Sequence, residues 1–279
     1  MTGAEVALIV LGAVAFLLLG SFTCVVIDRL PLALDEPNQY GELWDSRPWP
    51  EVFGGRSRCS SCGEQVRPID NVPILSWLVL RGRCRNCDER IPGFHPLVEL
   101  AFPLLYVAAV WVLGASWTLL PALWLIPVGL AVSVIDLRTL IVPTRIVWPA
   151  FFIAVALCAI VAGVEGEWRW LLSALVGMAV LAGPLFVLWF VIPQGMGFGD
   201  VRLSVLLGFT LGFYAQGSLL GAVFLSVICM FFSAVLGLLM GLVALGARGR
   251  KAKVPFGPAL VAGTFVCIAL AQPIIDAVR

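Results

Sequence analysis

The chain has 279 residues, of which 61% are hydrophobic and only 13% are charged, and its mean hydropathy is +1.01. These values exclude an ordinary soluble globular domain and predict a protein whose main solvent is the lipid bilayer. The formal net charge of +1 gives no sign of a nucleic-acid partner, because carboxylates match the arginines of the one long polar segment.

Eight apolar segments are candidates for membrane-spanning helices, each of which needs about 20 residues. They are Val6–Ile27, Pro96–Leu113, Trp117–Ile135, Ile146–Val164, Trp170–Ile192, Val201–Tyr214, Leu219–Leu245 and Ala259–Ile275. We expect the first to stay as an anchor, because no Lys or Arg precedes it as in a cleaved signal. The predicted fold class is an all-α polytopic membrane protein with about eight transmembrane helices.

The positions of the basic residues predict the orientation, since Lys and Arg are retained on the cytoplasmic side of inserted helices. With both termini outside, nearly all of the 18 basic residues fall in cytoplasmic segments. The predicted domains are a first transmembrane helix at residues 1–27, a small cytoplasmic insert at 28–95 and a transmembrane bundle at 96–279. No internal repeat is evident.

Two cysteine pairs lie in this insert, as Cys59-Ser-Ser-Cys62 and Cys84-Arg-Asn-Cys87. Two C-x-x-C pairs at this separation are typical of a zinc ribbon, in which four thiolates surround one ion. Two disulfides are the alternative, but a cytoplasmic location favours reduced thiols and therefore zinc. The zinc would be structural, because four thiolates leave no open position. Cys24, Cys158, Cys229 and Cys267 are isolated within spans and are interpreted as packing residues.

A pair of aspartates stands at the predicted cytoplasmic boundary of the membrane. Asp136 closes the third span, and Asp200 opens the sixth after Gly195-Met-Gly197-Phe-Gly199. A carboxylate at a helix C-terminus opposes the helix dipole, so Asp136 gains nothing from local helix stability. Asp200 could instead be a helix N-cap. If the two carboxylates meet, they share one proton, which allows one to activate water while the other donates a proton, as in aspartic proteases.

Other residues have competing interpretations. Glu99 is either a functional membrane carboxylate or an acid that complements a helix N-terminus. His95, the only histidine, is interpreted as an interfacial residue rather than a metal ligand. The Pro255–Pro258 segment is a helix-start turn or, less favoured, an exposed backbone that pairs with an extended substrate.

The chain resembles the type IV prepilin peptidases, the bacterial leader peptidases with a G-x-G-D motif. The residues that carry the resemblance are Gly20-Ser-Phe22, Val26-Ile-Asp-Arg-Leu-Pro31, the four insert cysteines, Asp70-Asn-Val-Pro-Ile-Leu-Ser-Trp77, Arg81-Gly-Arg-Cys84, Pro96-Leu-Val-Glu99, Ile135-Asp136-Leu137, Met196-Gly-Phe-Gly-Asp200-Val201 and Pro255-Phe-Gly-Pro258. The resemblance implies that Asp136 and Asp200 are catalytic and that Cys59, Cys62, Cys84 and Cys87 bind zinc.

The resemblance also implies the reaction and its setting. Such an enzyme lies in the bacterial inner membrane and removes a short basic leader from prepilins or pseudopilins at the cytoplasmic face, after a glycine. Many members then methylate the new N-terminal amine with S-adenosylmethionine. The sequence itself gives no cofactor-binding residues for this second reaction and no oligomeric state.

Four departures from the family pattern stand out. Val142-Pro143-Thr144 lacks the acid that usually follows the proline, Arg202 replaces a common Lys, Cys24 replaces an Asn, and Phe94-His95 replaces an Arg-Tyr pair. These leave hydrolysis intact and bear more on methylation. The alternative functions are a polytopic transporter or a non-catalytic pilus or secretion assembly scaffold with a zinc-ribbon docking module. Transporter sites lie near the bilayer midplane, whereas both aspartates are predicted at its edge.

Overall fold

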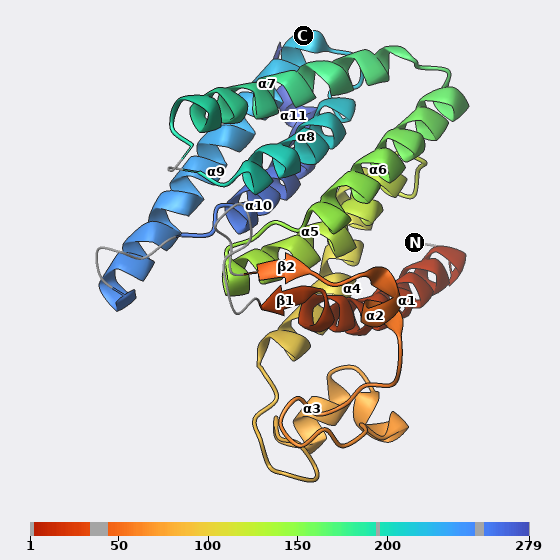
Figure 1. Cartoon of the computed structure of the whole chain (residues 1–279). Helices are drawn as coiled ribbons and strands as arrows, with labels where there is room; N and C mark the ends of the chain where they lie inside the picture. Colours follow the sequence, from red (N-terminus) through yellow and green to blue (C-terminus); the bar gives the residue numbers. More distant parts are fainter. Residues whose placement is uncertain (1–2, 34–43, 194–195, 249–253, 279) are drawn as a thin grey trace. The chain divides into compact units, whose positions relative to one another are not determined.

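The computed structural model describes residues 3–33, 44–193, 196–248 and 254–278 (Figure 1). Gly195 of the glycine-rich motif and the basic residues Arg250–Lys253 lie outside these ranges. The chain forms two compact units, Met1–Trp111 and Val112–Arg279. The finer predicted division into 1–27, 28–95 and 96–279 stays a prediction.

The first unit is built on two long apolar helices. Its elements are α1 (Gly3–Arg29), β1 (Pro31–Ala33), β2 (Trp44–Ser46), α2 (Trp49–Phe53), the 3-10 helix η1 (Pro68–Asn71), α3 (Leu75–Val79) and most of α4 (Phe94–Leu113). Helix α4 packs on α1, because the Tyr106 ring stacks on Phe16 at a centroid distance of 4.8 Å. The Tyr106 hydroxyl also donates a hydrogen bond to the Leu8 carbonyl, at 3.3 Å. The two short strands pair in antiparallel fashion.

The polar insert between these helices contains two turns of the same construction. Isolated antiparallel bridges join Arg58 to Gln65 and Arg83 to Arg90, one around each cysteine pair. The sequences Arg58-Cys-Ser-Ser-Cys-Gly-Glu-Gln65 and Arg83-Cys-Arg-Asn-Cys-Asp-Glu-Arg90 align without a gap. The prediction that the chain has no internal repeat is therefore wrong, because this repeat is too short and too divergent to stand out by composition.

The second unit is a helical bundle around one buried helix. Its elements are α5 (Leu119–Thr139), α6 (Thr144–Glu165), α7 (Arg169–Val191), α8 (Phe198–Phe213), α9 (Leu219–Arg248), α10 (Gly257–Ala269) and α11 (Ala271–Val278). Helix α8 contacts α6, α7, α9 and α10 and lies among them in Figure 1. Every residue from Leu206 to Phe213 is buried. A helix that is apolar on all sides is expected at such a central position.

Small residues bring α7 and α8 into close contact. A Cβ atom added at Gly177 would lie 2.6 Å from the Gly212 Cα atom, and one added at Gly208 would lie 2.8 Å from the Gly177 carbonyl oxygen. In lipid, such backbone approach supplies the van der Waals contact that holds helices together. The glycines therefore fix α8, and with it Asp200, against α7.

The described residues contain six helices that are long and apolar enough to cross a membrane, or seven if α10 and α11 form one span. The six are α1, α4, α5, α6, α7 and α9. The remaining predicted span corresponds to α8, whose 16 residues extend about 24 Å, less than the roughly 30 Å of a hydrocarbon core. The predicted span over Ala259–Ile275 corresponds to a broken pair of helices, because α10 and α11 meet at a bend of 62°. Pro273 explains this break, since its ring clashes with the carbonyl four residues earlier in a continuous helix.

Candidate functional sites

The carboxylate of Asp136 is buried at the C-terminal end of α5 and is held by a backbone amide. Its residue is only 4% exposed, and its Oδ2 atom accepts a hydrogen bond from the Gly257 N–H at 2.9 Å. Helix α5 ends just beyond it because Leu140 adopts a left-handed conformation (φ 59°) and donates its N–H to the Asp136 carbonyl. The side chain is thus oriented by the start of α10, far away in the sequence.

Gly257 has no space for a side chain at this position. A Cβ atom there would lie 2.8 Å from Asp136 Oδ2, so only glycine lets the α10 backbone come close enough to donate this bond. The interpretation of Pro255–Pro258 as a helix-start turn is confirmed, since α10 begins at Gly257 with a proline in its first positions. The backbone contact to Asp136 was not predicted from the sequence; a glycine between Pro255 and Pro258 was its only signal.

Asp200 lies in the first turn of α8, where its carboxylate is partly buried. The N-cap of this helix is Gly197, and no side-chain capping bond is formed, so the interpretation of Asp200 as an N-cap is wrong. Among the residues that the structure describes, its Oδ1 atom is buried without a hydrogen-bond partner. A buried carboxylate oxygen without a partner is costly unless another molecule or a shared proton satisfies it.

The two aspartates are brought together by close packing of the segments that carry them. A Cβ atom added at Gly199 would lie 2.8 Å from the Cβ of Val142, just beyond the end of α5. The carboxylates are close enough for the charge of Asp136 to act on Asp200. The glycine before Asp200 therefore lets the start of α8 approach the end of α5, so that the two acids share one site.

Two of the departures from the family pattern also meet at this site. The Arg202 guanidinium donates a hydrogen bond to the Thr144 hydroxyl and lies over the Phe198 ring, 5.2 Å from its centroid. Where the family has an acid and a lysine, this chain has a neutral acceptor and an arginine. Arginine suits this contact because its planar guanidinium both donates hydrogen bonds and stacks on an aromatic face.

The four insert cysteines, Cys59, Cys62, Cys84 and Cys87, lie together. Their Sγ atoms are all within 4.8 Å of one another, and those of Cys59 and Cys87 are 3.7 Å apart. A tetrahedron of thiolates at about 2.3 Å from zinc has edges of about 3.8 Å, whereas a disulfide needs about 2.05 Å. The arrangement therefore fits a four-coordinate metal, and all four thiols are free of disulfides.

Each cysteine pair sits on a turn that directs its sulfurs to one point. The Cys59 N–H donates to the Glu64 carbonyl and the Cys84 N–H to the Glu89 carbonyl, at 2.9 and 2.8 Å. The pKa of the Cys59 thiol is lowered to about 6, because the backbone N–H groups of Cys62 and Ser61 donate hydrogen bonds to it. The thiolate is the form of cysteine that binds a metal, so a thiol with a lowered pKa is suited to be a ligand.

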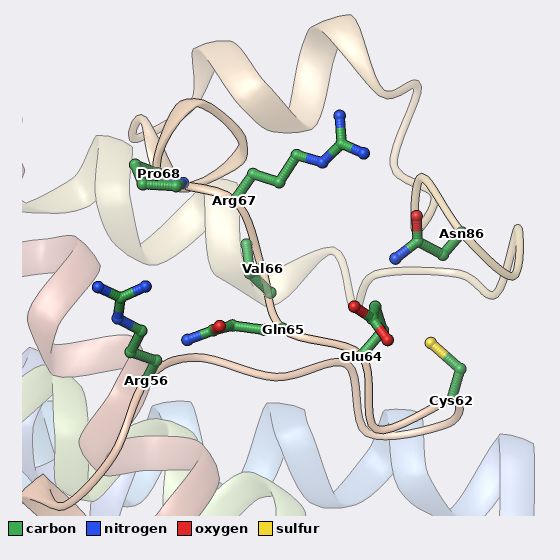
Figure 2. A pocket seen from close by; sticks show the side chains of 8 residues that line it. All are labelled: Arg56, Cys62, Glu64, Gln65, Val66, Arg67, Pro68 and Asn86. Carbon is green, nitrogen blue, oxygen red and sulfur yellow. The ribbon is translucent and has the colours of Figure 1, made fainter.

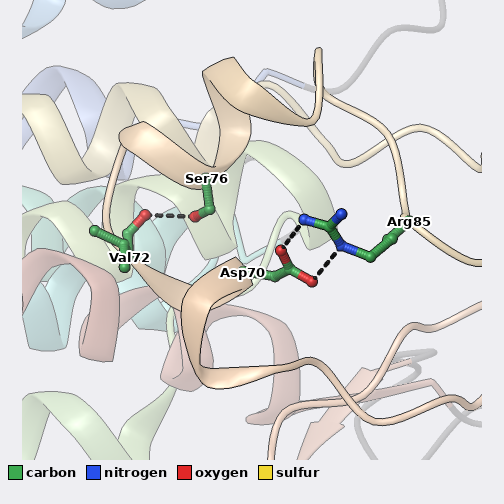
Figure 3. A network of polar contacts seen from close by, with 4 residues as sticks. All are labelled: Asp70, Val72, Ser76 and Arg85. Carbon is green, nitrogen blue, oxygen red and sulfur yellow. Dashed lines mark hydrogen bonds and ion pairs between the residues drawn. The ribbon is translucent and has the colours of Figure 1, made fainter.

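An ion pair ties the second of these turns to the segment around η1 (Figure 3). Arg85 donates two hydrogen bonds to the carboxylate of Asp70, at 2.6 and 2.9 Å. This pairing lowers the pKa of Asp70 below its usual value. Beside it, the Ser76 hydroxyl donates to the Val72 carbonyl. Both contacts stabilise the metal module, residues 58–90, which carries the two cysteine turns, without touching the cysteine sulfurs.

Glu99 and His95 have structural partners within the first unit. Glu99 Oε2 accepts a hydrogen bond of 2.7 Å from the N–H of Ile74, a residue with a positive φ of 61°. Glu99 thus holds a strained turn, a role that neither sequence interpretation included. His95 Nε2 lies 3.0 Å from Asp28 Oδ2, and the interpretation of His95 as an interfacial residue stays a prediction.

Two aspartates that share one partly buried site are the arrangement that an aspartyl protease requires, and here a helical membrane bundle holds them. Comparison with known proteins gives the family. The model of the Bacterial Peptidase A24 N-terminal domain matches residues 14–113, and that of the Type IV leader peptidase family matches residues 120–242. The chain belongs to the type IV leader peptidase family and is a multi-pass membrane peptidase.

Curated relatives match nearly the whole chain, and each is named prepilin leader peptidase/N-methyltransferase. The protein of Aeromonas hydrophila is 32% identical over 90% of this chain and 87% of its own length. That of Burkholderia pseudomallei is 34% identical over 94% and 84%. That of Bacillus subtilis is 30% identical over 93% of each chain. No solved structure matches the chain.

Proposed function

We propose that this protein is an aspartyl endopeptidase of the bacterial inner membrane that removes the leader peptide of prepilins or pseudopilins at the cytoplasmic face. The observation that carries the proposal is the meeting of Asp136 and Asp200 at the junction of α5, α8 and α10. The family match supports this function over a transporter or an assembly scaffold, neither of which needs such a pair.

The two carboxylates have different surroundings and therefore different roles. Asp136 accepts the Gly257 N–H, and a hydrogen bond of this kind stabilises the charged form of a carboxylate. Asp136 is the base that takes a proton from the attacking water. Asp200, whose Oδ1 lacks a partner among the described residues, carries the shared proton. It polarises the scissile carbonyl and then protonates the leaving amine.

The metal module holds one structural zinc ion through four cysteines, Cys59, Cys62, Cys84 and Cys87. Their spacing and mutual distances fit tetrahedral thiolate coordination. Zinc bound there supplies no catalysis, because four thiolates complete its coordination shell. The names of the relatives support a second activity, N-methylation of the new N-terminus. Its methyl donor would be S-adenosylmethionine.

A cleavage assay in detergent tests the peptidase. We expect Asp136→Asn and Asp200→Asn each to lose leader cleavage by a factor of about 1,000 or more, because neither amide can exchange a proton with water or substrate. Asp276→Asn, which changes an exposed aspartate of α11, is the control and should cleave like the parent. Cleavage at the parent rate in either variant would show that the substituted aspartate is not catalytic, whereas a parent that does not cleave at all would return the transporter or scaffold as the better account.

A further inference from the structure

The metal module carries an apolar surface that neither the metal site nor the two aspartates use. All large apolar side chains that are exposed within residues 58–90 fall in the short segment that contains η1 and α3. They are Ile69, Val72, Leu75, Leu78 and Val79. Single exposed apolar residues are common on protein surfaces, but a group of them in one segment marks an interaction surface.

Helix α3 presents an apolar face on one side and packs against the module with another. Leu75, Leu78 and Val79 have the i, i+3, i+4 spacing that places side chains on one helix face, and they are 61%, 58% and 75% exposed. Trp77, which lies between them in the sequence, is partly buried. It packs against Gly82, where an added Cβ atom would lie 2.8 Å from the Trp77 ring. The module is therefore attached to α3 through Trp77 and leaves the apolar face exposed.

A hydrogen bond holds the start of α3 beside the first turns of a membrane-spanning helix. The N–H of Ile74, the N-cap residue of α3, donates to Glu99 Oε2 at 2.7 Å. Glu99 belongs to α4, which begins at Phe94, so it lies about 8 Å along that helix. Helix α4 has 20 residues and extends about 30 Å, the thickness of the hydrocarbon core. Glu99 and the start of α3 therefore lie at the boundary of the bilayer.

Exposed arginines stand at both ends of the apolar segment. Arg67 comes directly before η1, and Figure 2 shows its side chain extending from the backbone next to Pro68, the first residue of η1. Arg81 follows the end of α3 and is also exposed. Apolar side chains bordered by arginines are typical of segments that lie in the membrane interface, where the guanidinium groups reach the lipid headgroups. Their positive charge favours anionic lipids.

We propose that residues 67–81 lie in the interface of the bilayer, with the apolar face of α3 among the acyl chains and with Arg67 and Arg81 bound to the phosphates of anionic phospholipids. This contact holds the metal module on the membrane where α4 enters it, and it requires neither peptidase nor methyltransferase activity. Lipid is favoured over a second copy of the chain or a substrate helix, because the bilayer already surrounds α4 at the level of Glu99, and either protein would have to displace it.

The test is photocrosslinking of the metal-loaded full chain in vesicles of equimolar phosphatidylglycerol, which is anionic, and phosphatidylcholine, which is neutral. The photoreactive residue p-benzoylphenylalanine replaces Leu78 in one protein and Val79 in a second. In a third it replaces Glu89, an exposed residue of the second cysteine turn, as the control. We expect phospholipid adducts at Leu78 and Val79 to be about tenfold more frequent than at Glu89, because only the apolar face of α3 lies among acyl chains.

Mass spectrometry of the adducts at Leu78 tests the role of the arginines. Adducts with phosphatidylglycerol should exceed those with phosphatidylcholine by about fivefold, the attraction of one surface arginine to anionic lipid. The added double change Arg67→Gln/Arg81→Gln should bring the two lipids to parity. Arg58→Gln/Arg90→Gln, which removes the same charge from the ends of the two cysteine turns, should leave the preference unchanged.

Three results would overturn the proposal. The first is a yield of phospholipid adducts at both Leu78 and Val79 that is no higher than at Glu89. The second is equal amounts of the two lipids in adducts of the protein that keeps all its arginines. The third is a crosslink from Leu78 to a second copy of the chain, or to a prepilin added to the vesicles, in place of lipid, and it would also identify what covers this surface.

Discussion

A single backbone amide determines the environment of Asp136. Substituting Gly257 with alanine places a methyl group where the Asp136 carboxylate now lies, since the added Cβ would be 2.8 Å from Oδ2. We expect Gly257→Ala to reduce leader cleavage by about 100-fold, because a displacement of about 1 Å in a catalytic group has effects of this size. Folding should be preserved, because alanine is favoured over glycine in a helix.

Gly241→Ala is the matched control for this prediction. An added Cβ at Gly241 would lie 3.6 Å from Val254, an ordinary contact, so kcat should remain at the parent value. Thermal unfolding of both variants separates loss of activity from loss of fold. If Gly257→Ala cleaves at the parent rate, the amide does not orient Asp136 for catalysis.

At the scale of elements, the contact between α7 and α8 depends on residues without side chains. Gly177→Ala would press a methyl group against the Gly212 Cα atom, which lies 2.6 Å from the added Cβ. We expect the variant to lose about 2 kcal/mol of stability, the usual scale of overpacking. Gly183→Ala in the same helix adds its methyl to open space and should unfold at the parent temperature or above. Equal unfolding temperatures would show that α7 can move away at little cost.

The ion pair between Asp70 and Arg85 makes the stability of the metal module depend on pH. Because Arg85 lowers the pKa of Asp70 in the folded protein, the pair stabilises the fold above the unfolded pKa of about 3.9. That contribution is lost as the pH falls through the lower folded pKa. The difference in unfolding temperature between the parent and Asp70→Asn should therefore be full at pH 7 and shrink below about pH 4. Asp88→Asn, which removes the same charge but leaves this ion pair in place, is the matched control, and a difference between the parent and Asp70→Asn that stays the same from pH 7 to pH 3 would show that the pair does not stabilise the fold.

For the whole molecule, strong and repeated patterns were predictable from the sequence. Long apolar runs predicted where the helices lie. The C-x-x-C spacing predicted a cysteine cluster, and its four sulfur atoms lie within 4.8 Å of one another. Contacts between distant segments were not predictable. The Gly257 N–H reaches Asp136 across 121 positions, and a backbone donor leaves no residue-type signature. The break between α10 and α11 was missed because Pro273 was counted only as part of an apolar run.

The exposure of the residues in the metal module predicts that a bound metal ion stabilises its fold. Residues from Glu64 to Pro68 and from Arg85 to Arg90 are exposed or only partly buried, so this segment has little core of its own, and small domains of this kind depend on a metal for folding. Chelation of the metal should therefore open the module and allow trypsin to cut at its arginines. The second unit should stay folded, because Asp136, Asp200 and Gly257 all lie within Val112–Arg279.

Limited trypsin digestion followed by mass spectrometry separates the two parts. Cuts at Arg58, Arg83, Arg85 or Arg90 should accelerate by about tenfold or more after chelation, because cleavage follows the population of the opened segment. Cys59→Ser should be cut rapidly without a chelator, and Cys158→Ser, which changes a buried thiol of α6, should behave like the parent. If chelated protein resists trypsin as the metal-loaded protein does, the turns and the Asp70–Arg85 pair are sufficient to hold the module.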